Sequence, residues 1–419
     1  MAIQFSATAR AIFSGFVVMF LQLFLAIVVL APEGPFEYRY QTLVQHDSHW
    51  FGNIVDRGYE TIVPPLSHKV MEVSNTGFFP AYPLLAAALR YGLGLSTQNA
   101  LLIVAQAAAW GFWTYVFLFC QRWGVSSSAQ FLGALLIVTH PAAFFLVAAY
   151  SESLFLMALL GFIYWSSRET RSAKIVAVLH GVVMSSTRIV GLPCALLPLV
   201  KRFWEITARK AFDLRAVWQN YGSAALISFS AMLGGLGFFA YCQLRWGHWD
   251  IYMLTQRLGW GIEPNYLAIF KPSSYRWLLP ALDNPTEASQ MAMTLGGLVL
   301  LAMIACEFLS ATGQTRPGER PARKQTARSV RVAFYFAGFV LYFLSVAGVA
   351  GVGMESMLRY EFCVHAVLVL ALLHYLANVP LRSRLGRAGA VTAIALISTA
   401  GLALESWYVW NFTRGNWVA

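Results

Sequence analysis

The sequence predicts an all-α polytopic membrane protein with about eleven transmembrane helices. Hydrophobic residues make up 58% of the 419 residues and charged residues only 12%, with a mean hydropathy of +0.58. A soluble chain of this length could not cover its core with so few charges. Its apolar runs are long enough to cross a hydrocarbon layer of ~30 Å, and basic residues gather in alternate connections between them.

The first apolar run could be mistaken for a signal peptide. It is long enough to span the membrane and no small-residue cleavage site follows it, so we expect a retained helix. The run 173–200 is too long for one simple helix and is interrupted by SSTRIVGLP, so two short helices are expected, with Arg188 near the outer turn between them. The predicted spans are 11–31, 98–119, 128–147, 151–167, 173–187, 188–200, 219–241, 283–309, 332–352, 359–378 and 388–408.

The charge distribution tests this topology. With the N-terminus inside, 19 of the 30 Lys and Arg residues but only 5 of the 19 Asp and Glu residues fall in inside segments. The inside net charge is then +14 and the outside net charge −3, as the positive-inside rule requires. The overall charge of +11 therefore reflects topology, and no nucleic-acid partner is expected. The basic segment 310–331 is predicted to be a cytoplasmic loop facing anionic lipid.

We expect a single transmembrane domain, 1–419, whose chemistry lies in the outer segments, since long loops carry function more often than the spans that hold them. The first outer loop is 32–97 and the second large one is 242–282. Within the first, 78–95 contains prolines and Arg90 and is expected to be interfacial or re-entrant.

The stretch QHDSHWFGNIVDRGY, 45–59, predicts an amphipathic interfacial helix. Asp47 and four apolar residues recur at helical spacing along one face, and Gly58 can end the helix. Asp47 stands at the start of this helix on its apolar side. It could be an N-cap, but an N-cap does not require the histidines that flank it, His46 and His49.

This stretch resembles the first outer loop of the PIG-V-like mannosyltransferases, membrane enzymes of the GT-C fold, whose loop reads roughly W-D-x-x-[HWY]-[FY]-x-x-I-A-x-x-G-Y. The chain keeps Asp47, the pair Trp50-Phe51, Ile54 and the Gly58-Tyr59 pair, and it departs at His46 and Val55. Further blocks follow in family order: FFPAYPLL (78–85), AYSESLFLMALL (149–160), STRIVGL (186–192), WGHWDIYMLTQRLGWG (246–261) and SMLRYEF (356–362).

The resemblance implies a GT-C-like bundle and an inverting transfer of a hexose, mannose in the family, from a polyprenyl-phosphate donor. It also implies that Asp47 is the catalytic base. Such a transfer needs a base for the acceptor hydroxyl and a cation for the leaving phosphate. Arg188 and Arg359 are the candidate cations, because an unpaired charge at membrane depth is costly. Each could instead pair with an internal carboxylate, for Arg188 foremost Glu152, which also suits the start of a helix.

The remaining candidate residues are assigned by position. Tyr360, His248 and Arg257 are expected to contact the donor. His248 and Arg257 lie in the second large outer loop, whose aromatic residues are also typical of an interfacial belt. His46, His49 and Glu152 are expected to orient Asp47 or the acceptor. Two histidines beside an aspartate also suggest a metal, but a lipid monophosphate leaving group does not need one, so metal-independent transfer without a cofactor is expected.

The expected acceptor is a lipid-linked or glycolipid hydroxyl, because there is no large soluble domain to recognise a protein. Short loops favour a bacterial inner membrane with the site facing the periplasm; in a eukaryote the counterpart is the ER membrane. The sugar could also be another hexose or an aminosugar. The alternative class is a lipid or lipid-linked-sugar transporter or flippase, although the sequence shows no convincing internal repeat of the kind common in transporters.

Overall fold

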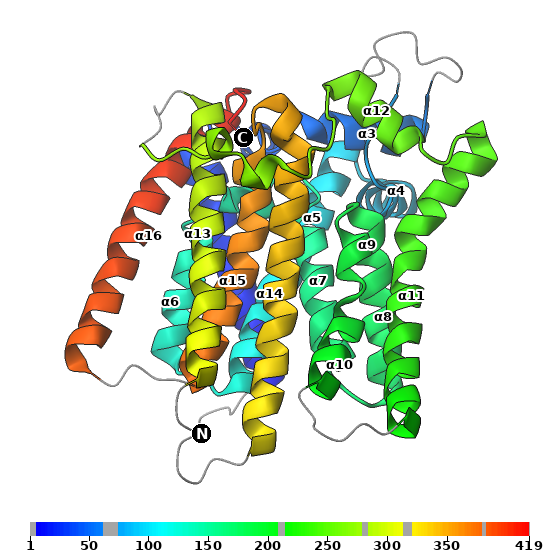
Figure 1. The fold of residues 1–419 in the computed structure, drawn as a ribbon. Helices are drawn as coiled ribbons and strands as arrows, with labels where there is room; N and C mark the ends of the chain where they lie inside the picture. The colour runs from blue at the N-terminus through cyan, green and yellow to red at the C-terminus, as the bar shows by residue number, and fades with distance from the viewer. Residues whose placement is uncertain are drawn as a thin grey trace.

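The computed structural model describes residues 6–61, 74–207, 214–278, 284–312, 321–378 and 383–418. These residues form helices, turns and connecting segments, with no strand among them, so the predicted all-helical polytopic fold is confirmed (Figure 1). The first described helix, α1, starts at one end of the bundle and the last, α16, ends at the other (Figure 1), as an odd number of crossings requires.

Eleven helical columns run between the two ends in the described residues, in agreement with the predicted number. The first is α1 (Ala7–Phe24) with its π-helical extension η1 (Leu25–Leu30). The others are α5 (Thr97–Trp123), α6 (Ser127–Val138), α7 (Glu152–Ser166), α8 (Arg171–Thr187), α9 (Gly191–Cys194) with α10 (Leu197–Thr207), α11 (Leu214–Trp246), α13 (Pro285–Thr312), α14 (Pro321–Val349), α15 (Met357–Asn378) and α16 (Arg384–Phe412).

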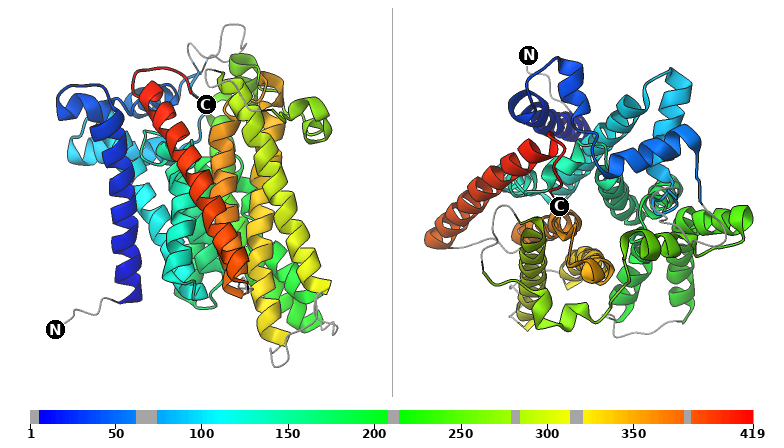
Figure 2. Two further views of the ribbon diagram at one scale, coloured as in Figure 1. Left: turned by 90° about the vertical axis from the view of Figure 1, so that its left-hand side faces the viewer. Right: turned by 90° about the horizontal axis from the view of Figure 1, so that it is seen from above.

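Seven of these columns are long and apolar enough to cross a membrane on their own: those containing α1, α5, α11, α13, α14, α15 and α16. The shorter columns include α7, which is apolar on all sides and buried along nearly its whole length. A helix that is apolar all round belongs inside a larger assembly. At the periphery, α16 tilts away from the bundle toward its Arg384 end (Figure 2), where most of its residues are exposed.

The predicted division of 173–200 is present. α8 ends at Thr187 because Arg188 is extended, and the chain turns back into α9 at Gly191. A Cβ at Gly191 would lie only 2.4 Å from the carbonyl oxygen of Met184, so this close approach requires glycine. The turn sets Arg188 at the same end of the bundle as the first outer segment.

Two predicted boundaries differ most from the structure, and proline explains both. The expected span 128–147 ends as a regular helix at Val138, two residues before the His140-Pro141 pair, because proline disfavours helical backbone at the residue before it. The chain then passes through a 3-10 turn, η3 (Ala143–Leu146). The expected loop 310–331 is helical from Pro321 onward as part of α14, since proline suits the first helical turn. Residues 313–320 lie outside the described residues.

The outer segments carry shorter helices. In 32–97 these are α2 (Phe36–Gln41), α3 (Asp47–Arg57) and α4 (Ala81–Leu93), while 62–73 lie outside the described residues. In 242–282, α12 (Ile251–Trp260) is followed by the 3-10 turns η4 (Ala268–Phe270) and η5 (Pro272–Ser274). A last 3-10 turn, η6 (Ala350–Val352), precedes α15. Figure 1 shows α3 and α12 together over one end of the bundle.

The sidedness of this arrangement can be tested by thiol labelling. Lys271 and Arg387 are both exposed, at opposite ends of the bundle. In a background where the exposed Cys306 is replaced by serine, we expect Lys271→Cys to react with an impermeant maleimide from the outside only. Arg387→Cys should react only after the membrane is opened, because the positive-inside bias predicts that this end faces the cytoplasm. Reversed labelling would contradict the orientation.

Candidate active site

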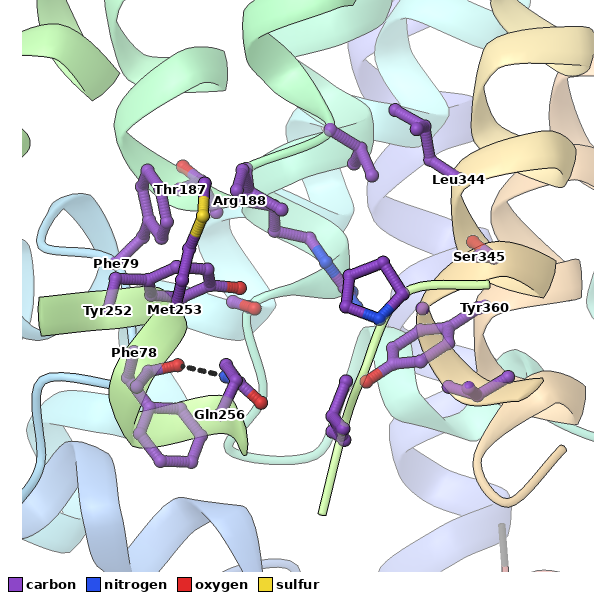
Figure 3. A pocket seen from close by; sticks show the side chains of 18 of the residues that line it. Phe78, Phe79, Thr187, Arg188, Tyr252, Met253, Gln256, Leu344, Ser345 and Tyr360 are labelled. Carbon is purple, nitrogen blue, oxygen red and sulfur yellow. Dashed lines mark hydrogen bonds between the residues drawn. The ribbon is translucent and has the colours of Figure 1, made fainter. Parts of the chain in front are cut away.

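A cavity of about 860 Å³ opens at the α3 end of the bundle. It is lined by α3, the 77–79 segment, the turn before α7, the α8–α9 break, α12, and the outer ends of α14 and α15. Most of its wall is apolar, and four of its charged side chains lie next to one another: Asp47, Glu152, Arg188 and Arg359. Figure 3 shows Arg188 extending into this space with Tyr252 and Gln256 of α12 nearby and Tyr360 of α15 opposite.

Four charged side chains form a chain at the cavity wall. Arg359 Nη1 donates to Asp47 Oδ2 at 2.6 Å, and Arg359 Nε lies 3.4 Å from Glu152 Oε1. Arg188 Nη1 donates to the same Glu152 oxygen at 2.8 Å. The order Asp47, Arg359, Glu152, Arg188 alternates in sign, so the four formal charges sum to zero.

The four charged side chains differ in how deeply they are buried. The side chains of Glu152 and Arg359 are 2% and 5% exposed, whereas those of Arg188 and Asp47 are 17% and 24% exposed. The inner two therefore depend on their partners, because a buried charge that loses its partner is strongly destabilising. Asp47 and Arg188, at the two ends of the row, expose part of their side chains to the cavity. Glu152 Oε2 is buried with no hydrogen-bond partner in the described structure.

Aromatic rings surround both arginines. The Arg359 guanidinium lies 5.1 Å from the ring centre of Tyr150 and 5.2 Å from that of Tyr360, and Arg188 lies 4.9 Å from the Tyr360 ring. Such contacts stabilise cations while excluding water. Burial raises the pKa of Tyr150 well above its usual value, with the charge of Asp47 as a further cause. Its hydroxyl therefore remains protonated, and it donates to the Gln45 carbonyl at 3.3 Å.

Asp47 is the first residue of α3, and its carboxylate does not cap that helix. The N-cap is His46, which makes no side-chain capping bond, and Asp47 instead reaches Arg359 across the bundle. The N-cap interpretation of Asp47 is therefore wrong. The predicted amphipathic face is present, with Phe51, Ile54 and Val55 each 5% exposed or less, and Gly58, with φ of 78°, follows the end of the helix.

Helix α12, which lines the cavity, is bonded to the first outer segment. Gln256 of α12 donates to the Gly77 carbonyl at 2.8 Å, and the hydroxyls of Thr255 and Thr76 are 2.8 Å apart. The Trp260 ring packs edge-on against Trp50 at 5.7 Å. Thr76 and Gly77 are therefore joined directly to α12, and the described parts of the two outer segments form one wall.

The structure brings some of the predicted site residues together and not others. Asp47, Glu152, Arg188, Arg359, Tyr360 and the exposed Arg257 line the cavity, whereas His46, His49 and His248 do not. His49 is exposed on α3, and His46 contacts the segment after α16 instead. Tyr150 was not among the predicted site residues. Its only signal is its place two residues before Glu152 in the AYSES block.

A group of titratable residues that could hold a metal lies elsewhere. His140, Glu361 and His365 place one potential ligand atom each within 4.8 Å of one another. Glu361 is two residues beyond Arg359 and so points to a different side of α15. The Ala142 N–H donates to His140 Nδ1 at 3.1 Å, so His140 carries its proton on Nε2 and donates it to Glu361 Oε2 at 2.7 Å. A metal on Nε2 would need the proton on Nδ1 instead, so this geometry is that of a hydrogen-bonded pair.

Comparison with known proteins gives distant structural similarity only. No family model and no curated protein matches the sequence. The chain is similar to a solved structure of the oligosaccharyltransferase AglB from Archaeoglobus fulgidus in complex with an inhibitory peptide and a dolichol-phosphate, with a TM-score of 0.49 and 12% identity. The similarity covers 95% of this chain and only 56% of that one. It is also similar to ArnT from Cupriavidus metallidurans in the apo state, with a TM-score of 0.36 and 17% identity, over 89% of this chain and 78% of that one.

Proposed function

We propose that this protein is an inverting membrane glycosyltransferase that moves a hexose, mannose by resemblance, from a polyprenyl-phosphate donor to a hydroxyl of a lipid-linked or glycolipid acceptor. One observation carries the proposal: a carboxylate and two arginines share the wall of a cavity of about 860 Å³ at the end of a membrane bundle. The resemblance of the Asp47 stretch and of the five further blocks supports the choice of reaction and of sugar.

Asp47 is the proposed base. Its Oδ2 is held by Arg359, which orients the carboxylate and leaves Oδ1 to receive the proton of the acceptor hydroxyl. As that proton leaves, the acceptor oxygen forms a bond to the anomeric carbon. The bond from this carbon to the phosphate oxygen breaks on the opposite face, so the anomeric configuration inverts. Positioned general bases of this kind contribute about 10²–10⁴-fold in rate.

Arg188 and Arg359 are the proposed cations for the leaving lipid phosphate. The phosphate gains one negative charge as the sugar departs, and fixed guanidinium groups at that point lower the barrier because they need not reorganise. In the structure Glu152 neutralises part of their charge. Arg188 has the more exposed side chain of the two and projects into the cavity (Figure 3), so it is the group with direct access to the phosphate. Tyr360 lies against both arginines, and Arg257 of α12 also lines the cavity.

The proposal is tested by reconstitution. Purified protein in liposomes should transfer sugar from a β-linked polyprenyl-phosphate mannose to one or more members of a panel of alkyl glycosides and glycolipids. The linkage formed should be α, as read by NMR of the isolated product. Parallel reactions with glucose and aminosugar donors establish which sugar is preferred. Movement of the labelled donor across the liposome membrane without release of lipid phosphate would instead support the flippase alternative.

A further inference from the structure

The segment that follows α16, Thr413–Val418, lies against the residue that precedes Asp47. His46 Nε2 is 3.1 Å from the carbonyl oxygen of Asn416, which accepts the ring N–H. The His46 ring stands nearly perpendicular to the Trp417 ring, with 5.0 Å between the ring centres. The Phe412 ring approaches from another side at 5.9 Å. This contact joins positions 46 and 416, which are far apart in the sequence.

Thr413–Val418 is itself firmly held. Arg414 donates to the carbonyls of Leu30 at 3.1 Å and Trp410 at 2.8 Å, and its guanidinium lies 3.9 Å from the Trp410 ring centre. Thr413 and Val418 are 2% and 4% exposed. The backbone N–H of Asn416 returns to the Asn411 carbonyl at 3.1 Å, so the segment folds back on the end of α16.

His46 has a backbone conformation that side-chain-bearing residues rarely adopt. Its φ is 52° and its ψ is −112°, a region that glycine enters easily and other residues enter at a cost. This conformation sets the direction in which α3 leaves the preceding turn, and hence where Asp47 points. A strained residue persists only when its surroundings hold it in place. The groups around the His46 ring come from Thr413–Val418 and the last turn of α16.

We propose that Thr413–Val418 is a positioning element for the base. Its contacts with the His46 ring maintain the strained backbone of His46, and this backbone directs the Asp47 carboxylate toward Arg359 and the cavity. This inference rests on the proposed function, since it assigns the segment a part in the same transfer. His46 is then a positioning residue that touches neither donor nor acceptor.

The first test uses Trp417. Trp417→Ala removes the ring that packs on His46, and we expect the turnover number to fall about 10-fold, because small displacements of a catalytic group have large effects on rate. The dissociation constant for the donor should not change, since Trp417 does not line the cavity. Trp417→Phe should restore turnover, because the ring contact remains and the lost indole N–H has no partner in the described structure. Trp277→Ala is the matched control, at a tryptophan that is 68% exposed and outside the cavity.

The second test is a double-mutant cycle with His46→Gly. Glycine adopts the required backbone angles without strain, so the Trp417 contact is no longer needed to hold the backbone at position 46. We expect Trp417→Ala to lower turnover about 10-fold in the wild-type background and to have little further effect in the His46→Gly background. Equal effects in both backgrounds would mean that Trp417 acts independently of His46, and would overturn the proposal.

Hydrogen exchange separates this inference from the proposed function. The backbone N–H groups of Ser48 and His49 donate to the carbonyl oxygens of Gln45 and His46, respectively, across the turn that contains His46. Trp417→Ala should accelerate exchange in a peptide covering 43–51, whereas Trp277→Ala should not. Unchanged exchange would overturn the positioning role even if sugar transfer is observed. Faster exchange in a protein that transfers no sugar would contradict the proposed function, but it would still support the claim that Trp417 holds His46 in place.

Discussion

Replacing Arg359 by glutamate is expected to abolish both donor binding and sugar transfer. The new carboxylate would stand beside Asp47 and Glu152, which now lie 2.6 Å and 3.4 Å from the Arg359 guanidinium, with Arg188 as the only cation left in this charge chain. Like charges at such separations repel strongly where water is excluded, and a lipid phosphate would be repelled as well. Binding of a fluorescent polyprenyl-phosphate sugar to the purified variant, after its insertion is verified, gives the measurement.

Because Arg359→Glu can also lower stability, Arg359→Lys provides a second measurement. A lysine keeps the charge but cannot span Asp47 and Glu152 with separate nitrogens as the planar guanidinium does. We expect kcat/KM to fall at least about 10-fold. Arg331→Lys is the matched control, since it breaks a buried bidentate pair with Glu307, at 2.6 Å and 2.9 Å, away from the cavity. That variant should lose thermal stability and retain donor affinity. Wild-type donor affinity in Arg359→Glu would assign Arg359 a structural role only.

The sequence predicted the bundle well because two strong signals agree. Spans of about 20 apolar residues are imposed by the bilayer, and the positive-inside bias distinguishes one long helix from two short ones at 173–200. The turn at Arg188 and the return through α9 and α10 follow that prediction. The prediction failed where helix breaking depends on local backbone chemistry: at His140-Pro141, where apolar composition continues past the true end of α6, and at Pro321, where charged residues start a helix.

The candidate site was accessible from the sequence only in part. Intramembrane arginines and acids are rare enough to be noticed individually, so Arg188, Arg359 and Glu152 could be named. Which partner each takes depends on tertiary packing. Asp47 and Arg359 are 312 positions apart in the chain, and no local pattern links them. The partners of His46 were hidden for the same reason: it is adjacent to Asp47 in sequence, but its ring turns to Asn416 and Trp417.

Replacing Asp47 by asparagine is expected to have the largest effect that leaves the fold intact. Asparagine is nearly isosteric, and its side-chain oxygen can still accept from Arg359 Nη1. It has lost the ability to accept the acceptor proton, so we expect turnover to fall by ~10²-fold or more. Some stability is lost as well, on the order of 1–3 kcal/mol, because Arg359 keeps only Glu152 as a charged partner.

Asp56→Asn on the same helix is the matched control. Asp56 is exposed and pairs with Arg90 and Thr97 on the outer surface of α3, away from the cavity lining. It tests whether loss of any carboxylate from this helix impairs transfer. We expect its turnover to match the wild type, since an exposed ion pair contributes only about 0–1 kcal/mol to stability.

The most direct test of the account is the single-turnover rate of sugar transfer from pre-bound donor, measured side by side for the wild type, Asp47→Asn and Asp56→Asn. Pre-binding separates the chemical step from donor affinity, and a thermal unfolding scan of each protein shows that it is folded. The account predicts that Asp47→Asn binds donor and reacts at least ~10²-fold more slowly, while Asp56→Asn reacts at the wild-type rate. An Asp47→Asn protein that is folded, binds donor and transfers sugar as fast as the wild type would contradict it.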